Sequence, residues 1–290
     1  MIFISDYFCD ETGDGFIGGA ELNDLALIQE IKKYAPVFTI KSERVNEQFL
    51  DNHKRELFVI SNFSHMPIPC LIKMVNDGFN YVIYEHDHKY LRTRNPTGYP
   101  DMMAPPELTC NIEFYRNAKA VFLQSNLHQS VYQKNTGLMN CINVAANFWT
   151  DAQCSKILSL SQSVKSGCGY IDSDKGFKNS MATYEYIVHT LHQEPVALKG
   201  TPDEFLEAMS KLESFVFLPK IIETFSRICA EAKMLGCKLI TRKDYVGFLS
   251  HPELTAMKPQ ELVDYFQKRK TQIAAELIKL ESEHASNNNS

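Results

Sequence analysis

Residues 216–240 read VFLPKIIETFSRICAEAKMLGCKLI, and this pattern predicts a strand, a helix and a second strand. The first apolar run ends at Pro219, and a helix is expected from about 224 to 235. Gly236 is placed to end that helix before residues 238–240 begin the next strand. Strands and helices that alternate in this way are typical of a parallel sheet with helices on both faces.

Two glutamates of this segment, Glu223 and Glu231, are separated by seven residues. On one helix, at about 100° per residue, they lie within about 80° of each other around the axis. The first turn of a helix also presents backbone amides that have no intrahelical acceptor and can bind an anion. The amides expected in this role belong to Thr224, Phe225, Ser226 and Arg227. Amides for a diphosphate and carboxylates for hydroxyls suit a nucleotide sugar, whereas the alternative is a solvated helix face.

The order of residues in this stretch resembles the E-x7-E signature of retaining glycosyltransferases with the two-Rossmann GT-B fold, especially glycosyltransferase family 4. The matching positions are Pro219, Glu223, Glu231, Ala232 and Gly236. The resemblance implies that Glu223 holds hydroxyls of the donor sugar and that Glu231 holds the ribose.

Strand-like and helical runs alternate along the rest of the chain, which supports an α/β fold with two Rossmann-like domains. The expected domains are an acceptor-side domain at 1–148 and a nucleotide-sugar-binding domain at 149–255. Residues 256–290 are expected to form a helix that returns to the first domain, followed by a frayed tail from His284.

Composition sets broad limits on the class of protein. The chain has 290 residues, 44% of them hydrophobic, and a net charge of −5, which argues against general nucleic-acid binding. No apolar run is long enough to cross a membrane, and the first residues lack the basic start of a signal peptide. The eight cysteines show no C-x-x-C pair, so a reduced, cytoplasmic setting is expected.

A glycine pair, Gly18 and Gly19, follows a predicted strand at 2–5 and an acidic loop at 6–16. Strand, glycine-rich loop and helix form a ligand cradle in doubly wound folds, although this one is not the dinucleotide fingerprint. The text Gly-Gly-Ala-Glu also resembles the N-terminal loop of the same glycosyltransferase family, so both glycines are assigned to donor binding. The alternative is a glycine pair that only permits a tight turn.

His86 follows the predicted strand at 81–84, where polar groups of an open α/β sheet meet a ligand. The resemblance implies that a histidine here reaches the donor sugar, so His86 is a candidate catalytic residue. His86 and His88 form a His-x-His pair, but on an extended segment the two side chains point to opposite sides, which argues against a metal site.

The residues after His86 are candidates for binding an acceptor. Asp87 and His88 are assigned to it with Arg92 and Arg94, and Lys89 adds to a local basic patch. Such a patch suits an anionic acceptor or a lipid phosphate, while a solvated basic loop is the alternative.

Lys175 and Lys178 lie after the predicted first strand of the second domain. The family places an Arg and a Lys there to bind the donor diphosphate, but no Arg lies between Gly169 and Gly176 in this chain. The phosphate role therefore passes to Lys175, Lys178 or Arg227. Asp172-Ser173-Asp174 resembles the metal clamp of a different, single-domain architecture, which this chain does not match.

The resemblance as a whole implies a metal-independent, cofactor-free enzyme that transfers a sugar from a nucleoside diphosphate sugar, with a uridine nucleotide as the first choice, and retains its configuration. The acceptor is left open among a glycan, a lipid and a modified nucleic-acid base, and peripheral membrane contact is compatible with the sequence. Two alternatives remain: an epimerase of the same fold, and a nucleotide-sugar-binding protein without activity.

Overall fold

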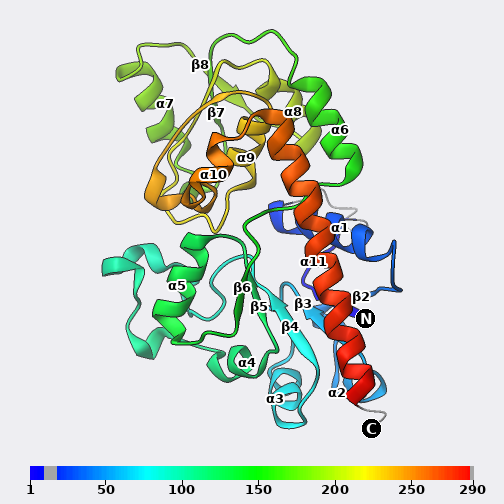
Figure 1. Ribbon diagram of the computed structural model, residues 1–290. Coiled ribbons are helices and arrows are strands. Elements are labelled where there is room, and N and C mark those ends of the chain that lie inside the picture. Colours follow the sequence, from blue (N-terminus) through cyan, green and yellow to red (C-terminus); the bar gives the residue numbers. More distant parts are fainter. Residues whose placement is uncertain (10–17, 288–290) are drawn as a thin grey trace. The chain divides into compact units, whose positions relative to one another are not determined.

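The computed structural model describes residues 1–9 and 18–287, without the side chains of 284–287 (Figure 1). Most of the acidic loop expected at 6–16 lies outside the described residues. The chain forms two compact units, which we call unit 1 and unit 2. Unit 1 comprises Met1–Gln124, His128–Thr150 and Gln267–Ser290, and unit 2 comprises Ser125–Leu127 and Asp151–Phe266.

Unit 1 contains a sheet of six parallel strands in the order β2-β1-β3-β4-β5-β6. The strands are β1 (Ile2–Ser5), β2 (Phe38–Lys41), β3 (Phe58–Ile60), β4 (Tyr81–Tyr84), β5 (Val121–Leu123) and β6 (Cys141–Asn143). Strands β1, β3, β4 and β5 are completely buried, as expected for the interior of a parallel sheet covered on both faces. All the strands run in the same direction, so their carboxyl ends lie along one edge.

Helices connect these strands. They are α1 (Gly19–Ile31), α2 (Glu47–Asn52), α3 (Ile68–Asn76), α4 (Ile112–Asn117) and α5 (Asn126–Thr136). The long helix α11 (Pro259–Asn287) starts in unit 2, and its later part belongs to unit 1. Within unit 1, Arg269 donates to the carbonyl oxygens of Asn143 and Val144, and Lys270 donates to that of Trp149. The frayed tail expected from His284 is therefore wrong as far as Asn287, because the backbone there is still helical.

Unit 2 contains a second parallel sheet in the order β10-β9-β7-β8. Its strands are β7 (Cys168–Ile171), β8 (Pro195–Leu198), β9 (Ser214–Phe217) and β10 (Lys238–Thr241). Its helices are α6 (Asp151–Leu160), α7 (Ser180–His189), α8 (Pro202–Ser210), α9 (Arg227–Met234) and α10 (Pro252–Ala256). Each unit is thus a Rossmann-like α/β layer structure, as the alternation of runs predicted.

The helix expected from about 224 begins later, at Arg227. Glu223 instead forms an isolated parallel bridge with Val246: its amide donates to the carbonyl of Tyr245, and its carbonyl accepts from the amide of Gly247. This pairing holds the chain extended, so tertiary contacts override the local helix pattern. The placement of both glutamates on one helix was therefore wrong, because only Glu231 is helical.

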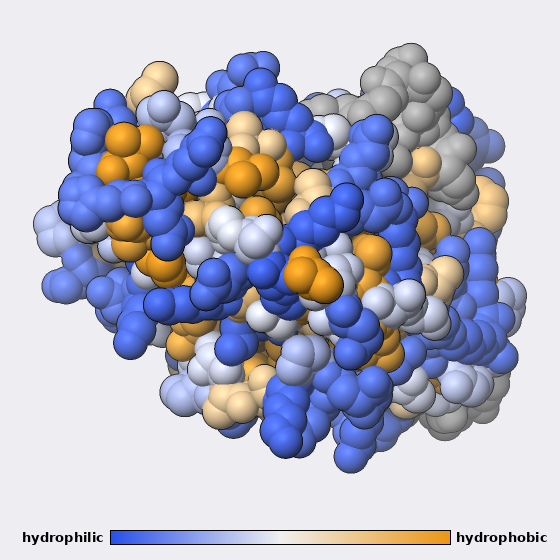
Figure 2. Space-filling view, turned by 90° about the horizontal axis from the view of Figure 1, so that it is seen from above, coloured by the Kyte–Doolittle hydropathy of each residue, from blue (hydrophilic) through white to orange (hydrophobic). Residues whose placement is uncertain are grey.

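Among the described residues no helix has the length and apolar character needed to cross a bilayer. The face seen in Figure 2 is mostly polar, with apolar residues in separate patches. None of the eight cysteines forms a disulfide, and all of them lie within the described residues.

Candidate functional site

Glu223 is held in unit 2 by the backbone pairing that delays the helix. The amide of Phe248 donates to the carbonyl of Phe225 at 2.7 Å and continues this pairing past Glu223. Gly247 allows the two segments to approach, because a Cβ atom there would lie 2.0 Å from the carbonyl oxygen of Thr224. Glu223 therefore projects from a fixed backbone, and its side chain is half-buried.

Lys178 is the cation that faces Glu223. Its Nζ lies 2.8 Å from Oε1 of Glu223, and it also lies 5.3 Å from the ring centroid of Phe217 at the end of β9. The segment carrying Lys178 is fixed in place, since the side-chain Nδ2 of Asn179 donates to the carbonyl oxygen of Leu218 at 2.7 Å. The structure therefore brings Lys178 to Glu223, whereas Lys175 is exposed to solvent.

Arg227 and Glu231 form a second ion pair in the same unit, one turn apart on α9. Nε of Arg227 lies 2.9 Å from Oε1 of Glu231, and its Nη2 lies 3.3 Å from Oε1 of Gln153 on α6. Both charged residues are buried, with exposed fractions of 8% and 7%. A pair this deeply buried contributes little net stability by itself, but removal of one partner leaves an uncompensated charge.

The start of α9 completes the candidate donor site. Ser226 is its N-cap residue, with a φ of 74°, and no side chain caps the helix. The positive end of the helix macrodipole thus lies next to Arg227. Burial raises the pKa of Cys229 on the same helix to about 12, so this thiol stays protonated at neutral pH and is unsuited to covalent catalysis.

In unit 1, His86 lies at the carboxyl edge of the sheet with both ring nitrogens engaged. Its Nε2 lies 2.8 Å from Oδ1 of Asp24 on α1, and its Nδ1 lies 2.7 Å from Nε2 of Gln124, which follows β5. The ring also packs 5.2 Å from that of Tyr84. His86 is therefore a fixed side chain, while its assignment to the donor sugar stays a prediction.

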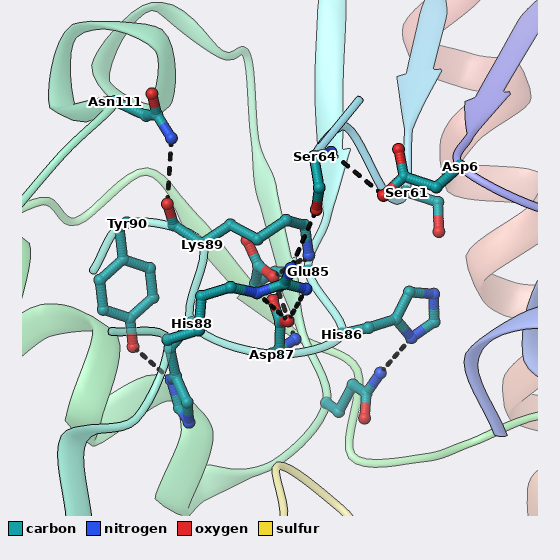
Figure 3. A network of polar contacts seen from close by, with 12 residues as sticks. Asp6, Ser61, Ser64, Glu85, His86, Asp87, His88, Lys89, Tyr90 and Asn111 are labelled. Carbon is teal, nitrogen blue, oxygen red and sulfur yellow. Dashed lines mark hydrogen bonds and ion pairs between the residues drawn. The ribbon is translucent and has the colours of Figure 1, made fainter. Parts of the chain in front are cut away.

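His88 lies on the opposite side of the chain from His86 (Figure 3). It is buried, its Nδ1 lies 2.7 Å from the Tyr90 hydroxyl, and its ring is 5.2 Å from that of His128. Burial lowers the pKa of His88 to about 4. The assignment of His88 to acceptor contact is thus at odds with its place in the core. No group of three or more His, Cys, Asp or Glu side chains could hold a metal ion within 1–9 and 18–287.

The expected basic patch is instead an ion cluster around the buried side chain of Lys89. Nζ of Lys89 lies 2.5 Å from Oε1 of Glu85 and 2.8 Å from Oδ1 of Asp87, and Lys89 is only 4% exposed (Figure 3). Nε of Arg94 lies 2.8 Å from Oδ2 of Asp87. Burial acts to raise the pKa of Asp87, but Lys89 and Arg94 outweigh it and lower that pKa. Of the three expected basic residues, Arg92 is the exposed one without a carboxylate partner described for it.

Gly18 and Gly19 open α1, as the sequence predicts. The amide of Gly18 donates to Oε2 of Glu21 at 2.9 Å, and a Cβ atom at Gly18 would lie 2.6 Å from that oxygen. Gly18 thus permits a cap made by the helix's own carboxylate, and a role for either glycine in donor binding stays a prediction.

Sequence reasoning missed Asp24 and Gln124, which hold His86. Asp24 lies within α1, where an acidic residue suggests a solvated face, yet it is only 1% exposed. Gln124 directly follows the buried strand β5. The available signal was its position directly after a strand, the same signal that identified His86.

No family model and no curated protein matches this sequence. Solved structures do match it. A UDP-forming α,α-trehalose-phosphate synthase of Burkholderia xenovorans, in complex with glucose-6-phosphate, has a TM-score of 0.57 at 8% identity, over 98% of this chain and 96% of that one. HepE of Anabaena, in complex with UDP and glucose, has a TM-score of 0.52 at 14% identity, over 100% and 99%.

A third match is an alpha-glucosyltransferase in complex with UDP-glucose and DNA containing an abasic site, with a TM-score of 0.51 at 13% identity, over 98% of this chain and 92% of that one. Membership of glycosyltransferase family 4 stays a prediction. At these identities the similarity shows the fold, which is the GT-B architecture of two Rossmann-like domains.

Proposed function

We propose that this protein is a glycosyltransferase that takes a sugar from a nucleoside diphosphate sugar, with UDP as the first choice of nucleotide, and transfers it with retained configuration. The observation that carries the proposal is the pairing of Lys178 with Glu223 and of Arg227 with Glu231 in one Rossmann-like unit. The similar structures of HepE and the alpha-glucosyltransferase, which hold UDP or UDP-glucose, support it.

The two ion pairs suit a site for an anionic ligand. Each cation has a carboxylate partner, so the site is close to neutral without ligand, and a diphosphate competes for the cations. Lys178 is half-buried and paired through one 2.8 Å contact, so it can turn from Glu223 to a phosphate at low cost. Glu223 is then released to accept hydrogen bonds from sugar hydroxyls, while Glu231 takes the ribose.

The same residues supply the electrostatics of transfer. Departure of the sugar leaves negative charge on the diphosphate, which Lys178, Arg227 and the positive end of α9 stabilise. The leaving phosphate can itself take the proton of the acceptor, so this mechanism asks for no metal and no cofactor. His86, with both ring nitrogens held by protein groups, would contact the sugar as a fixed ring and would not exchange a proton with it.

The acceptor is proposed only as a class. A glycan or lipid suits unit 1, because the exposed Arg92 can bind an anionic group and the partly exposed Asp87 can accept hydrogen bonds from hydroxyls. A nucleic-acid base is a second candidate, because the similar alpha-glucosyltransferase is bound to DNA. The net charge of −5 is unfavourable for a long polyanion, so the first class is preferred.

Calorimetry with UDP tests the donor assignment. UDP is expected to bind without added divalent metal and in the presence of a chelator. Lys178→Met is expected to weaken binding at least tenfold, on the scale of one charge-assisted hydrogen bond. The matched control is Lys175→Met, which removes an exposed lysine from the same loop and is expected to change affinity by twofold or less.

Three outcomes contradict the proposal. Strict dependence on a divalent metal would favour a clamp at Asp172 and Asp174, and equal effects of the two lysine variants would remove Lys178 from the site. Conversion of the nucleotide sugar without any acceptor would indicate the epimerase.

A further inference from the structure

A chain of buried hydrogen bonds crosses the carboxyl edge of the unit 1 sheet. Asp24 is at one end and accepts from hydroxyls at the ends of two strands: Oγ of Ser5 at 3.3 Å and Oγ of Ser61 at 2.5 Å. Its other oxygen faces Nε2 of His86, which follows β4. One helical carboxylate thus joins the ends of β1, β3 and β4.

The chain continues beyond the other side of the His86 ring. Nε2 of Gln124 lies 2.7 Å from Nδ1 of His86, and Nδ2 of Asn147 lies 3.1 Å from Oε1 of Gln124. Gln124 follows β5, and Asn147 lies in the segment after β6. Asp24, Gln124 and Asn147 are 1%, 3% and 5% exposed, so exchange of these partners for solvent is strongly restricted.

The chain has a defined direction. Nδ2 of Asn147 also lies 3.2 Å from the carbonyl oxygen of Ala146, which can only accept, so this end of the side chain is the amide nitrogen. It donates to Oε1 of Gln124, which turns the NH₂ group of Gln124 toward His86. A ring nitrogen that accepts from NH₂ carries no proton, and the proton of the neutral ring therefore lies on Nε2, facing Asp24.

We propose that Asp24, Gln124 and Asn147 are positioning residues that lock His86 as the uncharged Nε2–H tautomer, in one orientation. The catalytic part of this proposal rests on the proposed function, because His86 is there assigned to the donor sugar. A neutral, immobile ring presents no positive charge of its own to an anionic donor. It also removes the cost of orienting the ring when the sugar binds.

Gln124→Glu replaces the donor that faces Nδ1 of His86 with an acceptor and hardly changes the shape of the side chain. A carboxylate can only accept, so His86 must supply a proton from Nδ1 and become an imidazolium between two acids. The measurement is the nitrogen chemical shift of the imidazole rings in protein labelled with ¹⁵N-histidine, at neutral pH. The His86 signals are identified by their absence in His86→Gln. Gln162→Glu makes the same chemical change at an exposed glutamine and serves as the control.

The expected result is a single Nε2–H tautomer in the wild-type protein and in Gln162→Glu, and protons on both ring nitrogens in Gln124→Glu. A mixture of tautomers in the wild-type protein, a proton on Nδ1, or unchanged His86 signals in Gln124→Glu would each overturn the lock. These signals do not depend on activity. A confirmed lock in a protein that transfers no sugar would therefore refute the proposed function and leave the lock in place.

Sugar transfer tests the positioning role. Gln124→Glu is expected to lower kcat at least tenfold while UDP affinity stays within twofold, because the nucleotide is assigned to unit 2. Gln124→Met removes the hydrogen bond without adding charge, and a smaller loss of kcat is expected for it. Full activity of Gln124→Glu, with His86 protonated on both nitrogens, would show that the lock does not serve catalysis.

Discussion

The carboxyl edges of the two sheets hold their charges in different ways. In unit 1, Lys89 lies between Glu85 and Asp87 at 4% exposure, and His86 is fixed on both sides by neighbours. In unit 2, Lys178 meets Glu223 through a single contact, and both side chains are about one-fifth exposed. The first edge is closed by its own groups, whereas the second keeps a cation whose partner can be exchanged.

This difference indicates that the edge of unit 1 is rigid and that the edge of unit 2 can rearrange when a ligand binds. Buried groups with complete sets of partners form a rigid surface, because any rearrangement leaves a desolvated charge or donor unsatisfied. A partly exposed ion pair is weaker than a fully buried one and gives way more readily to a ligand of higher charge. A diphosphate is therefore expected to rearrange the edge of unit 2, whereas the edge of unit 1 is already ordered without a ligand.

The largest expected effect is a loss of stability on substitution of Lys89 in unit 1. Lys89→Met leaves the buried Glu85 without its cation, while the partly exposed Asp87 keeps Arg94, and the free energy of unfolding should fall by about 3–5 kcal/mol. Lys73→Met is the matched control, because Lys73 also lies 2.9 Å from each of two carboxylates, Asp51 and Asp77, but in an exposed pairing. Urea unfolding of both variants measures the two losses in the free energy of unfolding. Equal losses would show that burial of Lys89 does not increase its contribution to stability.

The contrast between the edges was only partly predictable. Sequence patterns identify the order of strands and helices, because burial of a parallel sheet imposes apolar runs and each helix imposes its own period. Strands β1 and β4 have the bounds that the sequence predicts. Such patterns carry no information on which loop approaches which, and for this reason the pairing of Glu223 with Val246 replaced the expected first turn of α9.

The candidate site shows the same limit. His86 could be selected because a polar residue after a buried strand lies at a ligand edge. Its partner Asp24 is 62 residues away in sequence, and only the fold brings the two together. Lys89 was read as part of a basic patch because composition alone does not reveal that a lysine is buried between two acids.

The second effect in size concerns the exchangeable edge. Glu223→Ala should lower turnover of a UDP-sugar about 100-fold, since a contact made to the reacting sugar appears mainly in the rate. UDP affinity should stay within about threefold, because Lys178 remains available to the phosphate. UDP release reports turnover and calorimetry reports affinity. Glu213→Ala, at an exposed position of the same unit, should alter neither. A parallel loss of affinity and turnover would instead assign Glu223 to the nucleotide.

The third effect is a loss of folding stability at low pH, caused by buried histidines of unit 1. Burial lowers the pKa of His88 to about 4 and also lowers that of His128. Below about pH 6.5 the unfolded histidine binds a proton that the folded one does not, so stability is complete above that pH and falls as the pH drops toward 4. His88 alone should account for about 2 kcal/mol between pH 7 and 5.

Urea unfolding at the two pH values checks this expectation. His88→Gln should reduce the difference between them, although the variant is less stable at both. His189→Gln, at an exposed histidine, should leave the difference unchanged. The same pH dependence in all three proteins would mean that carboxylates, and not the buried histidines, set the response to acid.

The smallest effect tests what remains of the expected basic patch. With Lys89 buried and Arg94 paired to Asp87, Arg92 is the exposed cation of that segment, so Arg92→Gln should reduce kcat/KM for an anionic acceptor only about threefold at low salt. The effect should vanish near 1 M salt, where the screening length falls to about 3 Å. Arg55→Gln, an exposed arginine of the same unit, is the control. A loss of kcat/KM that persists at high salt would indicate direct hydrogen bonding between Arg92 and the acceptor. Equal losses in both variants would mean that the overall charge of unit 1 causes the effect and that Arg92 has no specific role.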